Sequence, residues 1–129
     1  MTGRARFAYC WLPAIGWAVA IIVGTSLPSI PGPDLSAHNK TVHVIIYLVL
    51  GLLLLRGFMQ GEGWSIGRSA GWTILTGGTF GALQEFNQVF IPERTGSLAD
   101  VLANLAGVSL AAAAVWVLTR REGEEDLDG

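Results

Sequence analysis

Four long apolar stretches constrain the fold of this chain more than any other feature of its sequence. A transmembrane helix needs about 20 mostly apolar residues, and the stretches are residues 7–27, 41–59, 69–90 and 98–118. The third stretch is long enough but less apolar than the others. Prolines and glycines gather in the connectors, as expected where helices end. The sequence therefore predicts an all-α integral membrane protein with four transmembrane helices in a bundle.

The composition favours a membrane protein over a soluble domain. Of the 129 residues, 51% are hydrophobic and 14% are charged, against roughly 25% charged residues in soluble domains. The sequence has no basic stripe of the kind that binds nucleic acid, so no nucleic-acid partner is expected. The single cysteine, Cys10, excludes an intramolecular disulfide and is interpreted as a packing or lipid-facing residue.

The sequence predicts one domain over residues 1–119, followed by an acidic tail over residues 120–129. The tail lacks aromatic residues and is expected to be disordered. A cleaved signal peptide is an alternative for the first stretch, because Arg4 and Arg6 precede it and residues 18–20 read Ala-Val-Ala. The apolar run continues past this triplet to Val23, which favours a retained helix.

The distribution of Lys and Arg predicts the orientation of the bundle. Six of these eight residues lie near the termini or flank the connector between the second and third stretches. The other two, Lys40 and Arg94, lie in the first and third connectors. We therefore expect both termini to be cytoplasmic, and the first and third connectors to face outward.

Polar side chains gather at the outward ends of three predicted helices. They are Lys40, His43 and Tyr47 at the start of the second, Gln84, Glu85 and Gln88 near the end of the third, Asp100 and Asn104 at the start of the fourth, and Arg94 in the last connector. Because these helix ends lie on one side of the membrane, the side chains can meet in one layer. A charge at the centre of a membrane helix costs roughly 2.5–3.5 kcal/mol, so Glu85 is expected to have a partner.

Three of these residues are candidates for catalysis. A carboxylate beside an imidazole can carry acid–base chemistry when both are held in place, so Glu85 and His43 are the candidate acid and base. Asp100 is the third candidate and would orient them. A structural role stays open for Asp100, because it also completes a capping box that begins at Ser97.

The remaining polar residues are candidates for binding. They are Lys40, Tyr47, Gln88, Arg94 and Asn104. Lys40 and Arg94 can hold a phosphate or a carboxylate. Structural readings stay open here too, because a lysine near a helix end often extends its ammonium group to the interface, and a tyrosine in an apolar helix often only packs.

No metal ligand and no cofactor are assigned from the sequence. A weaker alternative is metal binding by His43, Glu85 and Asp100, because one imidazole and two carboxylates suit zinc or manganese. The chain has no ligand spacing such as His-x-x-x-His to support it. The third stretch carries Gly77-x-x-x-Gly81, which permits close helix approach and predicts a place inside the bundle.

The chain resembles the VanZ-like family in the segments NKTVHVIIYLVLG and EFNQVFIPERTGSLADVLANLAG. It departs from the family's pattern at Asn39, where an aspartate is usual. The resemblance covers nearly all of the chain except the acidic tail. It implies a small four-helix protein of the bacterial inner (cytoplasmic) membrane, and the family's namesake is associated with low-level resistance to the glycopeptide teicoplanin.

Two classes of function agree with these observations. In the first, the polar layer binds or protects an envelope component, such as a lipid-linked precursor or a glycopeptide. In the second, the chain is a membrane-embedded hydrolase or transferase that acts on a lipid-linked or headgroup substrate, with Glu85 and His43 as acid and base. The lipid bilayer is the expected partner, and a second copy or another membrane protein is compatible with either class.

Overall fold

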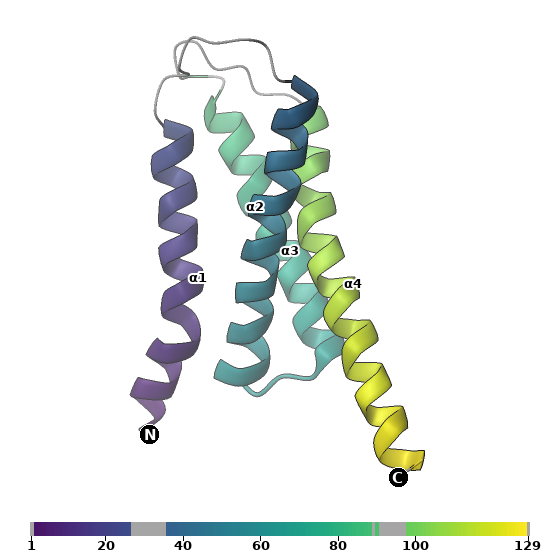
Figure 1. The fold of residues 1–129 in the computed structure, drawn as a ribbon. Coiled ribbons are helices and arrows are strands. Elements are labelled where there is room, and N and C mark those ends of the chain that lie inside the picture. The colour runs from purple at the N-terminus through teal and green to yellow at the C-terminus, as the bar shows by residue number, and fades with distance from the viewer. Residues whose placement is uncertain (1, 27–35, 89, 91–97, 129) are drawn as a thin grey trace.

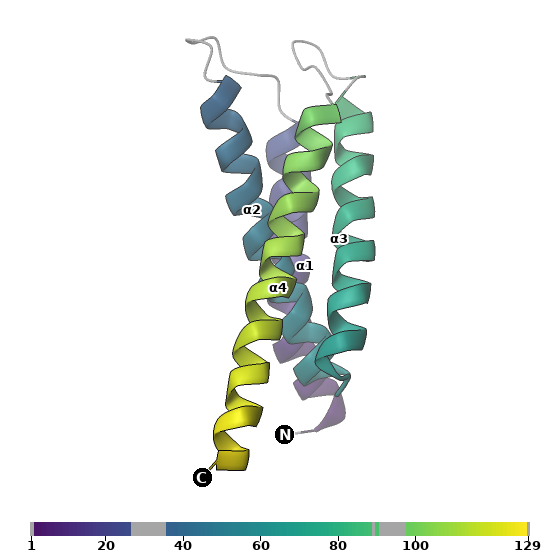
Figure 2. The same cartoon turned by 90° about the vertical axis from the view of Figure 1, so that its right-hand side faces the viewer.

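The fold is an up-down-up-down arrangement of long helices (Figures 1 and 2). The computed structural model describes residues 2–26, 36–88, 90 and 98–128. The elements are α1 (Gly3–Ser26), α2 (Ser36–Arg56), the π-helical segment η1 (Gly57–Gly61) that continues α2, α3 (Ile66–Gln88) and α4 (Leu98–Asp128). These helices overlap the four predicted stretches, and no strand occurs in the described part of the chain. The predicted all-α fold is therefore confirmed.

Three of the helical segments are long and apolar enough to cross a membrane. They are Gly3–Gly24, Lys40–Gly61 and Leu98–Gly123. Large apolar side chains lie exposed on their outer faces, including Leu12, Ile45 and Leu102, and such a surface fits a lipid bilayer. The helix α3 is not one of these three segments because it is less apolar. Its 23 residues are nevertheless long enough to cross a membrane, since they extend about 34 Å at 1.5 Å per residue.

Glycines bring α2 and α4 together. A Cβ atom on Gly107 of α4 would overlap the carbonyl oxygen of Val44 and lie 2.9 Å from the backbone nitrogen of Leu48. A Cβ atom on Gly51 of α2 would lie 2.7 Å from the Cβ of Ala111. Only glycine fits at such contacts, which are a common way for helices to pack in membranes.

The inner face of α3 consists of small and polar residues at intervals of three or four. The stripe consists of Ser69, Thr73, Gly77, Gly81, Glu85 and Gln88, and Ala70 beside it is also buried. Because helix positions four apart lie on one face, this stripe faces the bundle while Leu83 and Phe86 are exposed. The glycine-containing face of α3 lies inside the bundle as predicted, but the other face exposes large apolar residues that also include Trp72 and Leu75, so the expectation of a wholly interior helix is wrong.

The end of the bundle that holds both termini also holds η1 (Figure 1). Arg6 of α1 donates hydrogen bonds of 2.9 and 2.6 Å to the carbonyl oxygen of Gln60. The guanidinium of Arg68 lies 4.0 Å from the centre of the Trp64 ring. Arginine and tryptophan are typical of membrane interfaces, so this end has the character of an interfacial layer.

The helix α4 continues to Asp128. It therefore crosses residues 120–128, for which the composition predicts disorder. Arginine, glutamate and leucine all have high helix propensity and the segment contains no proline, so a helix that is already formed can propagate through it.

Candidate functional site

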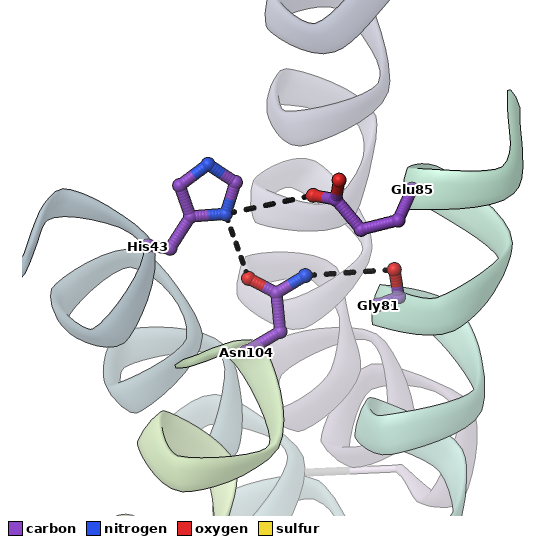
Figure 3. Close-up of polar contacts among 4 residues, drawn as sticks. All are labelled: His43, Gly81, Glu85 and Asn104. Carbon is purple, nitrogen blue, oxygen red and sulfur yellow. Dashed lines mark hydrogen bonds and ion pairs between the residues drawn. The ribbon is translucent and has the colours of Figure 1, made fainter. Parts of the chain in front are cut away.

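Three helices place polar side chains together at the end of the bundle opposite the termini. His43 comes from the start of α2, Glu85 from the last turns of α3, and Asn104 from the start of α4 (Figure 3). The His43 Nδ1 atom lies 2.8 Å from Asn104 Oδ1 and 3.7 Å from Glu85 Oε1. The structure therefore brings these residues of the second, third and fourth helices into one polar layer, as predicted.

Asn104 connects the other two helices to α4. Its side chain is buried, with 1% exposed. Its amide oxygen can only accept, so the Nδ1–H of His43 donates to it. Its amide nitrogen faces the carbonyl oxygen of Gly81 at a longer 3.5 Å. The amide therefore links α2 to α3 through α4, in the arrangement that Figure 3 shows.

Glu85 is the most deeply placed acidic group of this cluster. The residue is only 3% exposed, and its carboxylate points toward the imidazole of His43 (Figure 3). Burial of a carboxylate away from water is costly unless a positive charge or hydrogen-bond donors accompany it. The nearby imidazole agrees with the expectation that this carboxylate has a partner.

Asp100 completes an acidic pair at the same site. It lies in the first turn of α4, one turn before Asn104, and is partly buried. One ligand atom each of His43, Glu85 and Asp100 lies within 4.8 Å of the others. The three candidates for catalysis that the sequence suggests are therefore neighbours in space.

Small residues make room for this cluster. A Cβ atom on Gly81 would lie 2.9 Å from the Cβ of Asn104 and 3.1 Å from Cε1 of Tyr47. A larger residue at position 81 would push α4 away from α3. Glycine at this position therefore lets Asn104 sit against α3, where its amide faces the Gly81 carbonyl.

The other predicted binding residues differ in their surroundings. Tyr47 is 3% exposed and lies against Phe80, with ring centres 6.3 Å apart. Gln88 is 4% exposed and lies one turn beyond Glu85. Lys40 is exposed, one turn before His43 on α2. Arg94 lies outside the described residues.

Two buried hydroxyl groups were not among the predicted site residues. Ser69 and Thr73 are both 0% exposed, and neither hydroxyl oxygen has a hydrogen-bond partner among the residues that the structure describes. They continue the stripe of Gly77, Gly81 and Glu85 toward the other end of α3. The spacing of four residues in the sequence is the signal that could have shown them.

The cluster offers a carboxylate–imidazole pair, an amide and a second carboxylate in a setting shielded from water. An imidazole that faces a carboxylate can exchange a proton with it or with a bound group. The same donors can hold a ligand by hydrogen bonds or coordinate a cation. Both binding and acid–base chemistry are therefore within reach of these side chains.

Comparison with known proteins gives one relative of moderate similarity. The chain is 35% identical over 94 residues to an uncharacterized protein of Schizosaccharomyces pombe. The match includes 72% of this chain but 56% of the relative, so the chain spans little more than half of that protein's length. No protein-family model and no solved structure matches the chain. The expected VanZ-like resemblance and bacterial origin receive no support from these comparisons.

Proposed function

We propose that this chain is an integral membrane protein of the cell envelope that binds the polar part of a lipid-linked component through the cluster of His43, Glu85, Asp100 and Asn104. In this proposal α3 is the fourth membrane-spanning helix, both termini are cytoplasmic, and the cluster faces the outer leaflet of a bacterial inner membrane. Three apolar helices, the interior stripe of α3 and the arginine count support this arrangement.

The single observation that carries the proposal is the placement of the Glu85 carboxylate. Its residue is 3% exposed and it faces an imidazole 3.7 Å away, within a helix bundle whose outer surface is apolar. Ionisable groups inside membrane proteins are costly to place there, and they usually serve a function such as ligand or ion binding. Exposed Lys40 lies one turn before His43, nearer the start of α2, where the ammonium of a lysine can reach a phosphate at the headgroup level.

The resemblance to the VanZ-like family suggests which phenotype to measure. The growth of a teicoplanin-sensitive bacterium is compared for empty vector, wild type and Glu85→Gln at several concentrations of the glycopeptide. We expect wild type to raise the inhibitory concentration and Glu85→Gln to lose this effect, because glutamine keeps the shape of the side chain but not its negative charge. Immunoblots of the membrane fraction verify equal amounts of protein.

The matched control is Glu62→Gln, at the opposite end of the bundle. The exposed Glu62 carboxylate accepts a hydrogen bond of 3.0 Å from the Trp11 indole, which a glutamine oxygen can also accept. This variant is expected to protect like wild type. Protection by Glu85→Gln equal to that of wild type would contradict a role for the cluster, and no protection by wild type would contradict the teicoplanin link.

One observation favours an enzyme as a second candidate. The Nδ1 atom of His43 lies between an amide oxygen at 2.8 Å and a carboxylate oxygen at 3.7 Å, and such an imidazole can act as a proton carrier in hydrolysis or group transfer. Purified wild type incubated with a lipid-linked phosphate distinguishes the two candidates. Release of a product that Glu85→Gln does not release favours the enzyme, and binding without product favours the binding protein.

A further inference from the structure

We propose that His43, Glu85 and Asp100 form a binding site for a divalent transition-metal ion, with Zn²⁺ or Mn²⁺ as the ion. This inference rests on the proposed binding function, because it names what the same cluster holds when it meets a lipid-linked ligand. The three residues come from α2, α3 and α4. A bound ion would therefore also tie the three helices together at this end of the bundle.

The distances between the donor atoms fit one shared ion. A ligand atom from each residue lies within 4.8 Å of the other two, and His43 Nδ1 is 3.7 Å from Glu85 Oε1. Two ligands bound to one zinc ion at about 2.0–2.1 Å in tetrahedral geometry lie roughly 3.4 Å apart. A small rotation of the side chains is therefore enough to bring the donors to this spacing.

The chemistry of the donors selects the class of ion. Imidazole together with carboxylates suits zinc, manganese and iron, whereas calcium and magnesium prefer oxygen ligands alone. Two carboxylates balance the charge of a divalent ion, which favours transfer of the ion out of water into this largely buried place. Three protein ligands also leave coordination positions open for an external group.

Asn104 orients the imidazole of His43 before an ion binds. Its amide oxygen lies 2.8 Å from His43 Nδ1, and this contact holds the imidazole on the side of Glu85 (Figure 3). In most metal sites the ring nitrogen that does not bind the metal makes the supporting hydrogen bond, whereas Asn104 contacts Nδ1 itself and so orients the imidazole before an ion binds. An ion at Nδ1 takes the place of the proton that bonds Asn104, and the amide oxygen then faces the ion.

A bound ion also resolves a conflict in the proposed binding function. Two carboxylates repel a phosphate or another anion placed beside them, since like charges at short range are unfavourable. A divalent cation held by Glu85 and Asp100 cancels their negative charge, and its open coordination positions can then accept an oxygen of the anion, as metal ions do in many phosphate sites. The shared chemistry of the ligand is then a phosphate, either on a lipid headgroup or free.

The test is metal binding to full-length protein purified in detergent and stripped with a chelator. Isothermal titration with ZnCl₂ and with MnCl₂ is performed on wild type, Asp100→Asn and His43→Gln, with Glu62→Gln as the control from the other end of the bundle. We expect one ion per chain for wild type and Glu62→Gln. We expect affinity at least ~10–100-fold weaker for the other two variants, the loss usual when the support of a metal site is removed.

Wild type that binds neither ion in a stoichiometric amount overturns the proposal, whether or not the variants fold. Equal affinity in wild type, His43→Gln and Asp100→Asn overturns it too. Binding of a lipid phosphate and of inorganic phosphate is then measured with and without EDTA. Loss of lipid phosphate binding in EDTA supports the metal site. Unchanged binding in EDTA refutes the metal site and leaves the proposed binding function standing, and inorganic phosphate shows whether the lipid is needed.

Discussion

Asn104 holds the polar cluster together at the scale of single residues. From α4 it reaches both of the other helices of the cluster, with its oxygen on His43 of α2 and its nitrogen facing Gly81 of α3. Hydrogen bonds between helices in membranes contribute about 0.6 kcal/mol on average and up to about 1.7. A buried amide with two such contacts has a larger effect on the cluster than an exposed polar group.

Replacement of Asn104 by leucine is expected to destabilise the bundle by about 0.5–2 kcal/mol, because the imidazole loses its acceptor while the site stays filled. The control is Thr73→Val, which removes a buried hydroxyl that has no hydrogen-bond partner among the described residues. This change is expected to be neutral or stabilising, since an unsatisfied buried hydroxyl is unfavourable. Thermal unfolding midpoints in detergent compare the two variants, and equal loss in both would contradict this account of Asn104.

The sequence predicted which residues share this end of the bundle but not how they pair. Helix direction follows from the order of the stretches, so Lys40, His43, Glu85 and Asp100 could be placed on one side without coordinates. The pairing of His43 with Asn104 depends on the distance between α2 and α4 and on side-chain rotamers, which periodicity does not contain. The sequence predicted a partner for Glu85 without identifying it, and the structure places the carboxylate beside His43.

At the scale of helices, the close packing of α4 against α2 depends on glycine at position 107, in addition to the glycine at position 51. Gly107 contacts the backbone of α2 at Val44 and Leu48. These residues flank Tyr47 and lie just beyond His43, so the helix separation at Gly107 also sets the distance between His43 and Asn104. The cluster is therefore coupled to helix packing one turn away.

Substitution Gly107→Ala is expected to separate α2 from α4 and to destabilise the protein by about 1–3 kcal/mol, as overpacking of tight contacts does. Gly71→Ala is the matched control, because nothing lies within 4 Å of a Cβ atom at that exposed position of α3. Alanine there is expected to leave stability unchanged or to raise it by up to about 1 kcal/mol through helix propensity. Unfolding in denaturant measures both, and a Gly107→Ala variant as stable as wild type would contradict the close approach.

The helices themselves were predictable because apolar length and glycine or proline breaks are local signals. The continuation of α4 to Asp128 was not predicted, since the acidic composition suggested disorder although arginine, glutamate and leucine, which make up most of the segment, favour helix. The third stretch is only weakly apolar because one face of this helix packs against other helices. Its Ser69, Thr73 and Gly77 are buried against other helices, so it does not need large apolar residues on that face.

The two ends of the whole molecule differ in chemistry. The end with the termini holds Arg6 on a backbone carbonyl, Arg56 over Tyr9 and Arg68 over Trp64. The opposite end holds the buried cluster of carboxylates, imidazole and amide. Arginine-rich segments stay on the cytoplasmic side of membranes, so this asymmetry supports the proposed orientation, in which the cluster lies on the far side.

This direction is testable with single cysteines in a Cys10→Ala background. Thr2→Cys and Glu122→Cys mark the end with the termini, and Leu98→Cys marks the end with the cluster; all three positions are exposed. A membrane-impermeant maleimide is expected to label Leu98→Cys in intact cells and the other two only after lysis, because an even number of spans returns the chain to the side on which it began. Labelling of Thr2→Cys and Glu122→Cys on opposite sides would mean that α3 does not cross the membrane. Labelling of both in intact cells would reverse the orientation and put the cluster, with any ion or headgroup it binds, on the cytoplasmic side.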